Sequence, residues 1–268
     1  MGAGVSGWRL ARAVSAVGQL GVISGTGLDN ILSRRLQDGD PGGHMRRALA
    51  RLPFPAMAER ILRRHYRPEN RRADAPYRTL SMHTIEGNRE AQELCLAANF
   101  VEISLAREEH DHPVGINYLE KIQLPHLPSL YGAMLAGAHV VIVGAGIPLE
   151  MPAVLDALSR HEPVSYPVAL RSSPTRDTVR TAFDPRDFRD GPVDLPTLSR
   201  PHFLPIVSSE PLARILLRRC GDGISGFIVE HHSAGGHNAP PRGARNAAAG
   251  GRLAYGPRDD IDLNGIRK

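Results

Sequence analysis

Lysine is almost absent from this chain. Of its 33 basic residues only Lys121 and Lys268 are lysine, so the net charge of +5 rests on arginine. That bias is typical of a general preference for arginine codons rather than of a phosphate-binding surface. The densest basic stretch, residues 46–72, has apolar residues at helical spacing between its arginines, as the solvated face of a helix does. We therefore expect no nucleic-acid partner.

Cysteine is also scarce, and long apolar runs are missing. Cys95 and Cys220 stand far apart without CxxC spacing, which excludes a disulfide framework and a cysteine-based zinc site. No apolar stretch approaches the roughly 18 residues of a membrane-spanning helix, and no apolar segment of a signal peptide follows the start. We therefore expect a cytoplasmic protein that spans no membrane.

Motifs of two large enzyme classes are missing too. The chain has no G-x-S-x-G, the turn that presents the serine of many hydrolases, and SGTG (24–27) does not replace it. GAGIP (144–148) lacks the spacing and the downstream acidic residue of a dinucleotide-binding fingerprint. A serine hydrolase and a Rossmann dehydrogenase are therefore not expected.

Short apolar runs alternate with helical patterns along the chain. Most of the runs are rich in β-branched residues and end near small or polar ones, which is typical of parallel strands buried on both faces. The alternation predicts an α/β fold of the (β/α)8 TIM-barrel type, with a doubly wound sheet as the competing architecture. The predicted strands are 18–25, 101–105, 113–119, 139–146, 203–209 and 226–230, and the predicted helices are 8–17, 127–138, 147–160 and 209–220.

The predicted barrel is incomplete, because about five convincing strands stand against the eight of a closed barrel. Residues 30–100 interrupt the alternation as a mostly helical, arginine-rich insertion, and residues 171–202 form a Pro- and Asp-rich excursion without periodicity. After Gly243 we expect no further buried strand or helix. The chain is predicted to form one domain, 1–268, in which the insertion and the excursion are loop elaborations.

Polar residues follow the predicted strands, at the end where parallel α/β folds bind ligands. Adjacent Gly235 and Gly236 let the backbone approach a flat ligand, and His237 can exchange a proton near neutral pH. Asn117 offers an amide at the end of another strand. Each of these residues also has a plainer interpretation as a turn residue or a surface side chain.

Two further pairs of polar residues stand at strand ends. Ser208 and Ser209 either contact a ligand or cap the helix that follows. His231 and His232 have the chemistry of metal ligands, but neighbouring side chains on an extended segment point to opposite sides, and no other ligand stands at a familiar spacing. No metal site is therefore predicted.

With these residues assembled, the chain resembles the nitronate monooxygenase family (formerly 2-nitropropane dioxygenases) of FMN-dependent TIM barrels. The family's strand followed by AGGH corresponds to FIVEHHSAGGH (227–237). Residues 1–25, 113–119 and 205–230 agree with the family in order. The extended motif AGGHNAPPRG, with residues 117–138, is similar to the long-chain subgroup, which is related to the enoyl reductases of polyketide and polyunsaturated-fatty-acid synthases.

The resemblance implies an activity and a set of site residues. His237 would be the base that removes a proton from a nitroalkane, or a nitronate would bind directly, and electrons would pass to FMN and then to O2. Glu230 stands where many members of the family have a flavin-contacting glutamine. The residues implied to contact FMN are Gly2, Ala3, Asn117, Glu230, Gly235 and Gly236.

Departures from the family pattern leave two alternatives open. The family's first strand and its last two strands, whose loops carry the FMN phosphate site, have no counterpart here, which predicts a truncated member. His231 and His232 replace what is more often a Gly-Pro-like pair. The alternatives are an NAD(P)H-dependent enoyl reductase acting on enoyl thioesters, and an inactive fragment.

Overall fold

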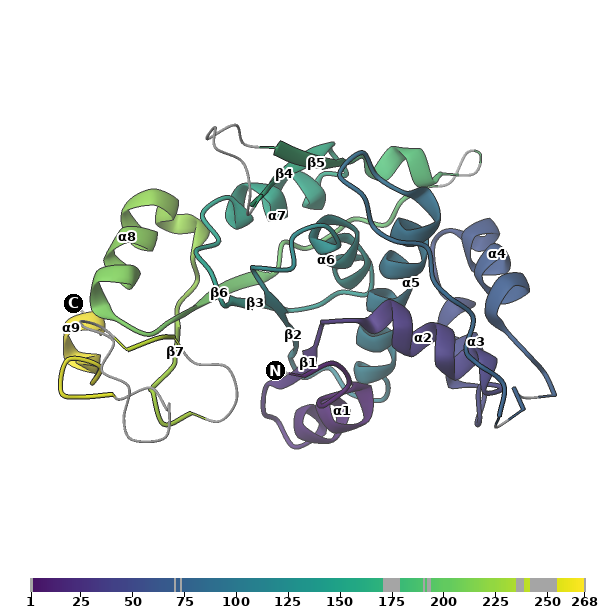
Figure 1. The fold of residues 1–268 in the computed structure, drawn as a ribbon, viewed down its shortest axis with the longest axis horizontal. Coiled ribbons are helices and arrows are strands. Elements are labelled where there is room, and N and C mark those ends of the chain that lie inside the picture. Colours follow the sequence, from purple (N-terminus) through teal and green to yellow (C-terminus); the bar gives the residue numbers. More distant parts are fainter. Residues whose placement is uncertain are drawn as a thin grey trace.

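The fold is built on one parallel sheet whose strands follow each other in chain order. The structure, a computed structural model, describes residues 2–69, 71–72, 74–170, 179–189, 191, 194–234, 239–241 and 255–267. In space the strand order is β1 (Gly21–Ser24), β2 (Val114–Leu119), β3 (Val140–Gly144), β6 (His202–Val207) and β7 (Ile228–Val229). Figure 1 shows these strands running from beside α1 toward α8.

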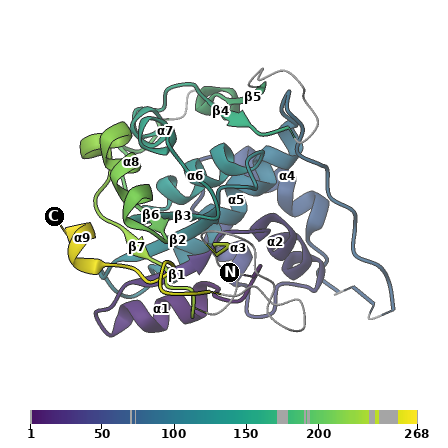
Figure 2. The same cartoon turned by 60° about the vertical axis from the view of Figure 1, so that its left-hand side comes forward.

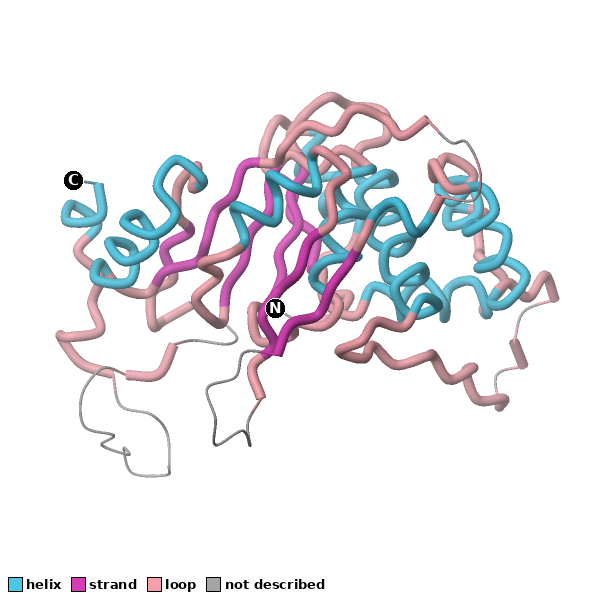
Figure 3. Tube along the Cα trace, turned by 90° about the horizontal axis from the view of Figure 1, so that it is seen from above, coloured by secondary structure: helices cyan, strands magenta, loops and turns pink. Residues whose placement is uncertain are grey.

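This strand order bears on the two predicted architectures. Each connection carries the chain onward to the next position in the sheet, and the direction never reverses in the described residues. A doubly wound sheet reverses its order at a switch point, whereas a barrel does not. The five strands form a curled sheet, about half of a barrel, and Figure 3 shows them side by side along this curve.

Helices cover the outer face of the sheet. The long helix α5 (Arg89–Ala106) lies at the centre of this layer and packs against α1, α2, α3 and α6. Its first turn is capped by Asn88, whose side-chain oxygen accepts a hydrogen bond from the backbone N–H of Ala91. The other helices are α1 (Trp8–Ala16), α2 (Leu28–Gln37), α3 (His44–Leu49), α4 (Pro55–His65), α6 (His126–Leu135), α7 (Met151–Ser159), α8 (Glu210–Cys220) and α9 (Leu263–Arg267).

One predicted strand is wrong, because residues 101–105 belong to α5. The run VEISL is apolar and β-branched, which favours a strand when it is considered alone. In the structure α5 is surrounded by other helices, and 14 of its 18 residues are buried. A helix that is buried all round lacks the one-sided apolar stripe of a surface helix, so its sequence resembles that of a buried strand.

The predicted insertion and excursion are described in part. Residues 30–100 hold most of α2, α3, α4 and the start of α5, so the segment is largely helical, as predicted. The excursion 171–202 is more regular than expected, because β5 (Val179–Phe183) pairs antiparallel with β4 (Val164–Val168) and a 3-10 helix follows at Pro185–Phe188. Figure 2 shows this strand pair lying apart from the main sheet. After Gly243 the structure describes one short helix, α9, which is not buried, in keeping with the expectation of no further buried helix among the described residues.

Close packing of α5 on α6 depends on a glycine. A Cβ added to Gly132 of α6 would lie 2.1 Å from the backbone oxygen of Leu96 in α5. Only a residue without a side chain allows this approach of two backbones. The small residue therefore fixes the spacing of the helix pair that supports β2.

The two faces of the sheet differ in character. Tyr118 of β2 points outward, where its hydroxyl donates to Asn99 of α5 and lies 3.1 Å from the backbone oxygen of Ser129 in α6. Side chains alternate along a strand, so Asn117 points to the opposite, concave face. It pairs there with Ser24 of β1 and Ile142 of β3. The concave face thus carries two neighbouring polar side chains, Ser24 and Asn117, at the β1 and β2 end of this row.

No helix in the described ranges has the length and apolar character needed to cross a membrane.

Candidate active site

The carboxyl ends of the strands form a continuous edge, held together by backbone hydrogen bonds. Gly25 N–H donates to the oxygen of Asn117, and Glu120 N–H donates to the oxygen of Gly144. At the other end of the sheet, Glu230 N–H donates to the oxygen of Val207. Residues that follow different strands are therefore fixed next to one another, as a ligand site at this edge requires.

The N-terminal segment lies against the carboxyl end of β1. The Cβ of Ala3 is 3.5 Å from the position that a Cβ would take on Gly27, the residue before α2. Ser6 donates through its hydroxyl to the oxygen of Val22 and accepts through its backbone oxygen from Ser24 N–H. Gly2 and Ala3 are thus near the edge of the sheet where the resemblance implies a ligand.

Asn117 is a buried side chain with an unsatisfied polar atom. It is 9% exposed, and within the described part of the chain its Oδ1 has no hydrogen-bond partner. Leaving a buried amide oxygen without a partner costs about 1–3 kcal/mol, so such an atom is rarely kept without a reason. An acceptor on the concave face, at the end of a central strand, is suited to a ligand N–H.

Glu230 follows β7 and lies well away from Asn117 along the sheet. Three inter-strand steps separate β2 from β7, or roughly 14 Å along the sheet. Glu230 lines a small hollow of about 20 Å³ together with Ser208, His232 and Tyr255. Gly235, Gly236 and His237 lie outside the described residues.

Two other strand-end predictions are resolved. Ser209 caps α8, with its Oγ accepting a hydrogen bond from Leu212 N–H at 3.4 Å, which favours the helix-cap interpretation over a ligand contact. In GAGIP, a Cβ on Gly146 would lie 2.3 Å from Cγ of Glu120. The glycine thus brings the loop after β3 against the residue that follows β2.

A cavity of about 830 Å³ lies over the carboxyl ends of β1 and β2. Its walls come from these strand ends, from α2, α5 and α6, and from residues 77–83. Apolar side chains cover part of the wall, and charged or polar groups cover the rest. The apolar residues include Leu28, Leu80, Ile122, Leu124 and Val168, and the polar ones include Asp29, Arg34, Arg78, Lys121 and His126.

Two histidines on this cavity are backed by carboxylates. His126 Nε2 lies 3.6 Å from Glu120 Oε2, and His83 Nε2 lies 3.7 Å from Asp29 Oδ2. Both nitrogens are buried and have no hydrogen-bond partner among the described residues, and the separations exceed normal hydrogen-bond length. Each imidazole thus leaves a nitrogen for a ligand while a carboxylate stands beside it.

The protonation of the cavity wall follows from burial and from these neighbours. Burial raises the pKa of the Cys95 thiol well above its usual value, so Cys95 stays neutral although Ser129 Oγ is 3.0 Å away. Burial alone would raise the pKa of Asp29, but His83 and the backbone N–H of Asn30 outweigh it and lower that pKa. A neutral thiol is a poor nucleophile, which argues against cysteine catalysis here.

The Glu120 carboxylate is held in place by a tyrosine. Tyr166 of β4 donates through its hydroxyl to both carboxylate oxygens, each at 2.8 Å. Burial raises the pKa of this hydroxyl, and the Glu120 carboxylate raises it further, so the phenol remains a donor at neutral pH. The carboxylate is therefore fixed beside His126.

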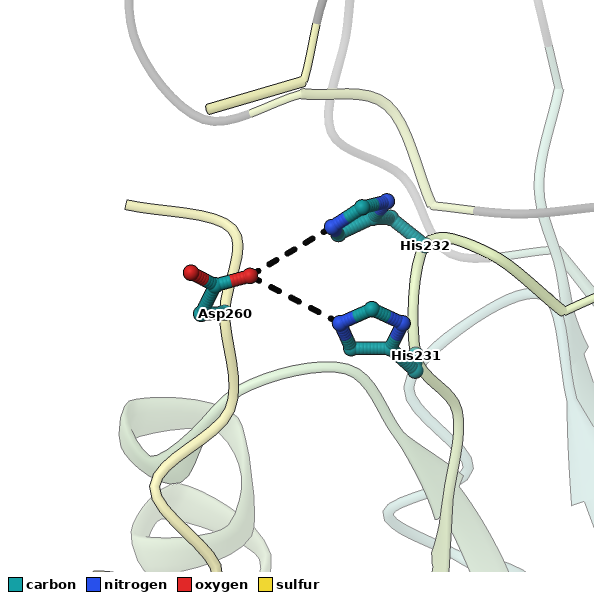
Figure 4. A group of neighbouring side chains, drawn as sticks. All are labelled: His231, His232 and Asp260. Atoms are coloured by element: carbon teal, nitrogen blue, oxygen red, sulfur yellow. Dashed lines mark ion pairs between the residues drawn. The ribbon is translucent and has the colours of Figure 1, made fainter. Parts of the chain in front are cut away.

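The geometry of His231 and His232 corrects one step of the sequence interpretation. The two side chains do not diverge: Nε2 of His231 and Nε2 of His232 lie 3.6 Å and 3.4 Å from the same oxygen, Oδ1 of Asp260 (Figure 4). These three groups are the one set of potential metal ligands found in the described part of the chain. Of the two grounds for expecting no metal site, the divergence of the two side chains is absent, while the third ligand group, Asp260, stands at no familiar spacing in the sequence.

Sequence reasoning missed Glu120, His126 and Asp260. A signal for the first was present, because Glu120 directly follows a predicted strand, where ligand groups are expected. His126 begins a helix after Pro125, and nothing in the local pattern distinguishes it from a surface histidine. Asp260 is distant in sequence from its histidine partners, so only the tertiary fold brings it to them.

Comparison with known proteins gives no assignment. No protein-family model matches the chain, and no curated protein matches it.

Proposed function

We propose that this chain is an FMN-dependent oxidoreductase of the nitronate monooxygenase type, built on part of a TIM-type barrel and acting on nitroalkanes or nitronates with O2. The observation that carries the proposal is Asn117, whose buried amide oxygen is unsatisfied on the concave face of the sheet. The motif resemblance of residues 227–237 supports the same assignment. FMN bound at this edge would accept electrons from the substrate and pass them to O2.

The described residues fit a flavin at one part of its ring. Asn117 offers an amide that can accept from and donate to a heterocycle that carries both N–H and carbonyl groups. Ala3 and Gly27 leave little side-chain bulk beside it at the end of β1. Gly2 and Ala3 would line this region, while Gly235 and Gly236 would let the backbone come close to the ring.

The chain's own residues would supply a base and exclude water. His237 would take the proton from the carbon next to the nitro group, because an imidazole titrates near neutral pH and can hold a proton there. The cavity of about 830 Å³, which adjoins the end of β2 but is not lined by Asn117, would hold the alkyl part of the substrate, and its apolar wall would exclude water there.

A substitution of the base tests this function. In His237→Asn protein supplied with FMN, turnover of a neutral nitroalkane should fall on the order of 100-fold or more, because no group removes the proton. Turnover of the preformed nitronate should remain, since it needs no proton removal. Oxygen uptake with each substrate measures both rates.

An exposed histidine at the other end of the sheet provides the matched control. His112 precedes β2 at its amino end, and His112→Asn should leave both rates unchanged. Unchanged nitroalkane turnover in His237→Asn would contradict the assigned role. If His237→Asn lost turnover of both substrates while it retained flavin, the defect would lie in substrate binding instead of proton removal.

The size and apolar wall of the cavity favour a second candidate, an enoyl reductase acting on acyl thioesters. A volume of about 830 Å³ is in the range that encloses a drug-sized ligand or a segment of an acyl chain. Oxidation of NADPH that depends on an enoyl thioester, with no oxygen uptake on a nitronate, would favour this candidate over the first.

A further inference from the structure

Three potential metal ligands meet at the end of β7. His231 and His232 follow this strand directly, and Asp260 comes from the segment before α9. Figure 4 shows both imidazole rings turned toward the Asp260 carboxylate. One ring nitrogen of each histidine and an oxygen of Asp260 all lie within 4.8 Å of one another. Two segments far apart in sequence thus present their ligand atoms to one point.

The separations of these atoms match the edges of a coordination polyhedron. The distances of 3.4 and 3.6 Å from the histidine nitrogens to Asp260 Oδ1 exceed the 2.7–3.2 Å range typical of N–H···O hydrogen bonds. Ligands bound at about 2.0–2.1 Å in a tetrahedral site stand about 3.3–3.4 Å apart. Small movements of exposed side chains would close the remaining difference.

The rings are oriented by neighbouring groups as metal-binding histidines usually are. Nδ1 of His231 lies 2.7 Å from Ser233 Oγ, and Ser233 N–H donates to the same nitrogen at 3.3 Å. When a cation takes the Nε2 lone pair, the imidazole proton moves to Nδ1, where Ser233 Oγ can accept it and the longer contact with the N–H is given up; this is the usual role of an outer partner. The His232 ring stacks on Tyr255 with centroids 5.0 Å apart and lies tilted against His231 at 4.0 Å.

We propose that His231 Nε2, His232 Nε2 and Asp260 Oδ1 bind one divalent transition-metal ion of the zinc class, with a fourth position open to water. Two neutral imidazoles and one carboxylate are a ligand set that such ions favour. Partial exposure of all three side chains gives a hydrated ion direct access. The bound ion would join the C-terminal segment to the end of β7, next to Glu230.

Cobalt provides a direct test, because tetrahedral Co²⁺ has visible d–d bands that octahedral aqueous Co²⁺ largely lacks. The full chain, freed of any affinity tag and treated with a chelator, should bind one equivalent of Co²⁺ with these bands, and Zn²⁺ should displace it. His231→Ala, His232→Ala and Asp260→Asn should each remove the bands. Ser233→Ala should weaken the affinity on the order of 10-fold while the bands remain.

Controls separate this site from adventitious binding and from misfolding. His112→Ala and Asp222→Asn change exposed residues of the same types elsewhere and should leave the cobalt spectrum unchanged. Far-ultraviolet circular dichroism of each metal-free variant should match that of the wild type, since the three ligands are largely at the surface. None of these measurements needs flavin, so a colourless protein that binds cobalt would keep this site while the proposed oxidoreductase fails.

Two results would overturn the proposal. One is a wild-type protein that shows no tetrahedral cobalt bands at equimolar metal. The other is a spectrum that persists in His232→Ala, or that carries a thiolate charge-transfer band, which would place the ion at a cysteine such as the half-exposed Cys220.

Discussion

The side chain of Asn117 keeps a buried oxygen that the described part of the fold does not satisfy and that the proposed flavin would satisfy. Its Oδ1 is buried without a partner among the described residues, whereas the neighbouring Tyr118 hydroxyl, on the other face, bonds with α5 and α6. An apolar residue of similar size would remove the cost of the unsatisfied oxygen. Asn117→Leu thus separates the stability of the sheet from ligand binding.

His65 gives the fold a dependence on pH at the residue scale. Burial, with a smaller effect of Arg64, lowers the pKa of His65 to about 4, and its Nδ1 lies 3.0 Å from Ser33 Oγ. An unfolded chain binds a proton at this imidazole near pH 6.5. Between about pH 6.5 and 4 the unfolded state therefore holds more protons, so stability falls as pH falls.

We expect this residue to lower the free energy of unfolding by about 2 kcal/mol over that window, since solvent screens part of the full shift. Urea unfolding at about pH 7.5 and about pH 4.5 measures the change in the wild type and in His65→Gln. The variant should lose less stability on acidification than the wild type. Equal losses in the two proteins would show that His65 is not the titrating group.

At the scale of elements, the predicted helices and strands are right where the local sequence pattern specifies them. They are wrong where burial depends on the packing of neighbouring elements. The strands of the main sheet were found because β-branched runs end at small or polar residues. Residues 101–105 have the same local pattern but lie in α5, where helices on several sides bury them. The antiparallel pair of β4 and β5 was not predicted. In β5 (Val179–Phe183) the exposed residues Arg180 and Ala182 stand between more buried ones, so the segment is not a continuous apolar run.

Only those residues of the candidate site that can be identified from the nearby sequence were predictable. Asn117 follows from its position at a strand end, whereas Glu230 was implied by the family resemblance, and the structure describes both near the carboxyl edge. The pairing of Asp260 with His231 and His232 could not be predicted, because it depends on where the C-terminal segment returns to the sheet. The cavity also depends on tertiary packing, since its walls come from several helices and a loop.

The contact between α5 and α6 supports the strand that carries Asn117, and it makes a prediction at this scale. Gly132→Ala should destabilise the protein by about 3 kcal/mol, because the new Cβ would overlap a backbone oxygen that cannot move aside. Gly256→Ala is the matched control, since a Cβ there meets nothing within 4 Å. Thermal unfolding of the two variants compares them. A Gly132→Ala protein as stable as the control would contradict the close packing.

At the scale of the whole molecule, the order of the strands determines how the candidate sites are arranged along one edge of the sheet. All five strand ends lie at one edge, the N-terminal segment packs at the β1 end of this edge, and the C-terminal segment reaches the β7 end. Figure 1 shows the N-terminus beside β1 and the C-terminus beside α8. The edge thus carries the cavity at one side and the His231–His232–Asp260 cluster at the other.

Retention of FMN is the most direct test of the proposal that this chain binds a flavin at Asn117. The purified 268-residue chain is incubated with FMN, separated from free flavin by gel filtration and examined by visible absorption. We expect about one flavin per chain in the wild type, a clearly weaker retention in Asn117→Leu, and no loss of stability in that flavin-free variant. A wild-type chain that folds yet emerges without flavin at saturating FMN, or an Asn117→Leu protein that retains FMN as the wild type does, would contradict it.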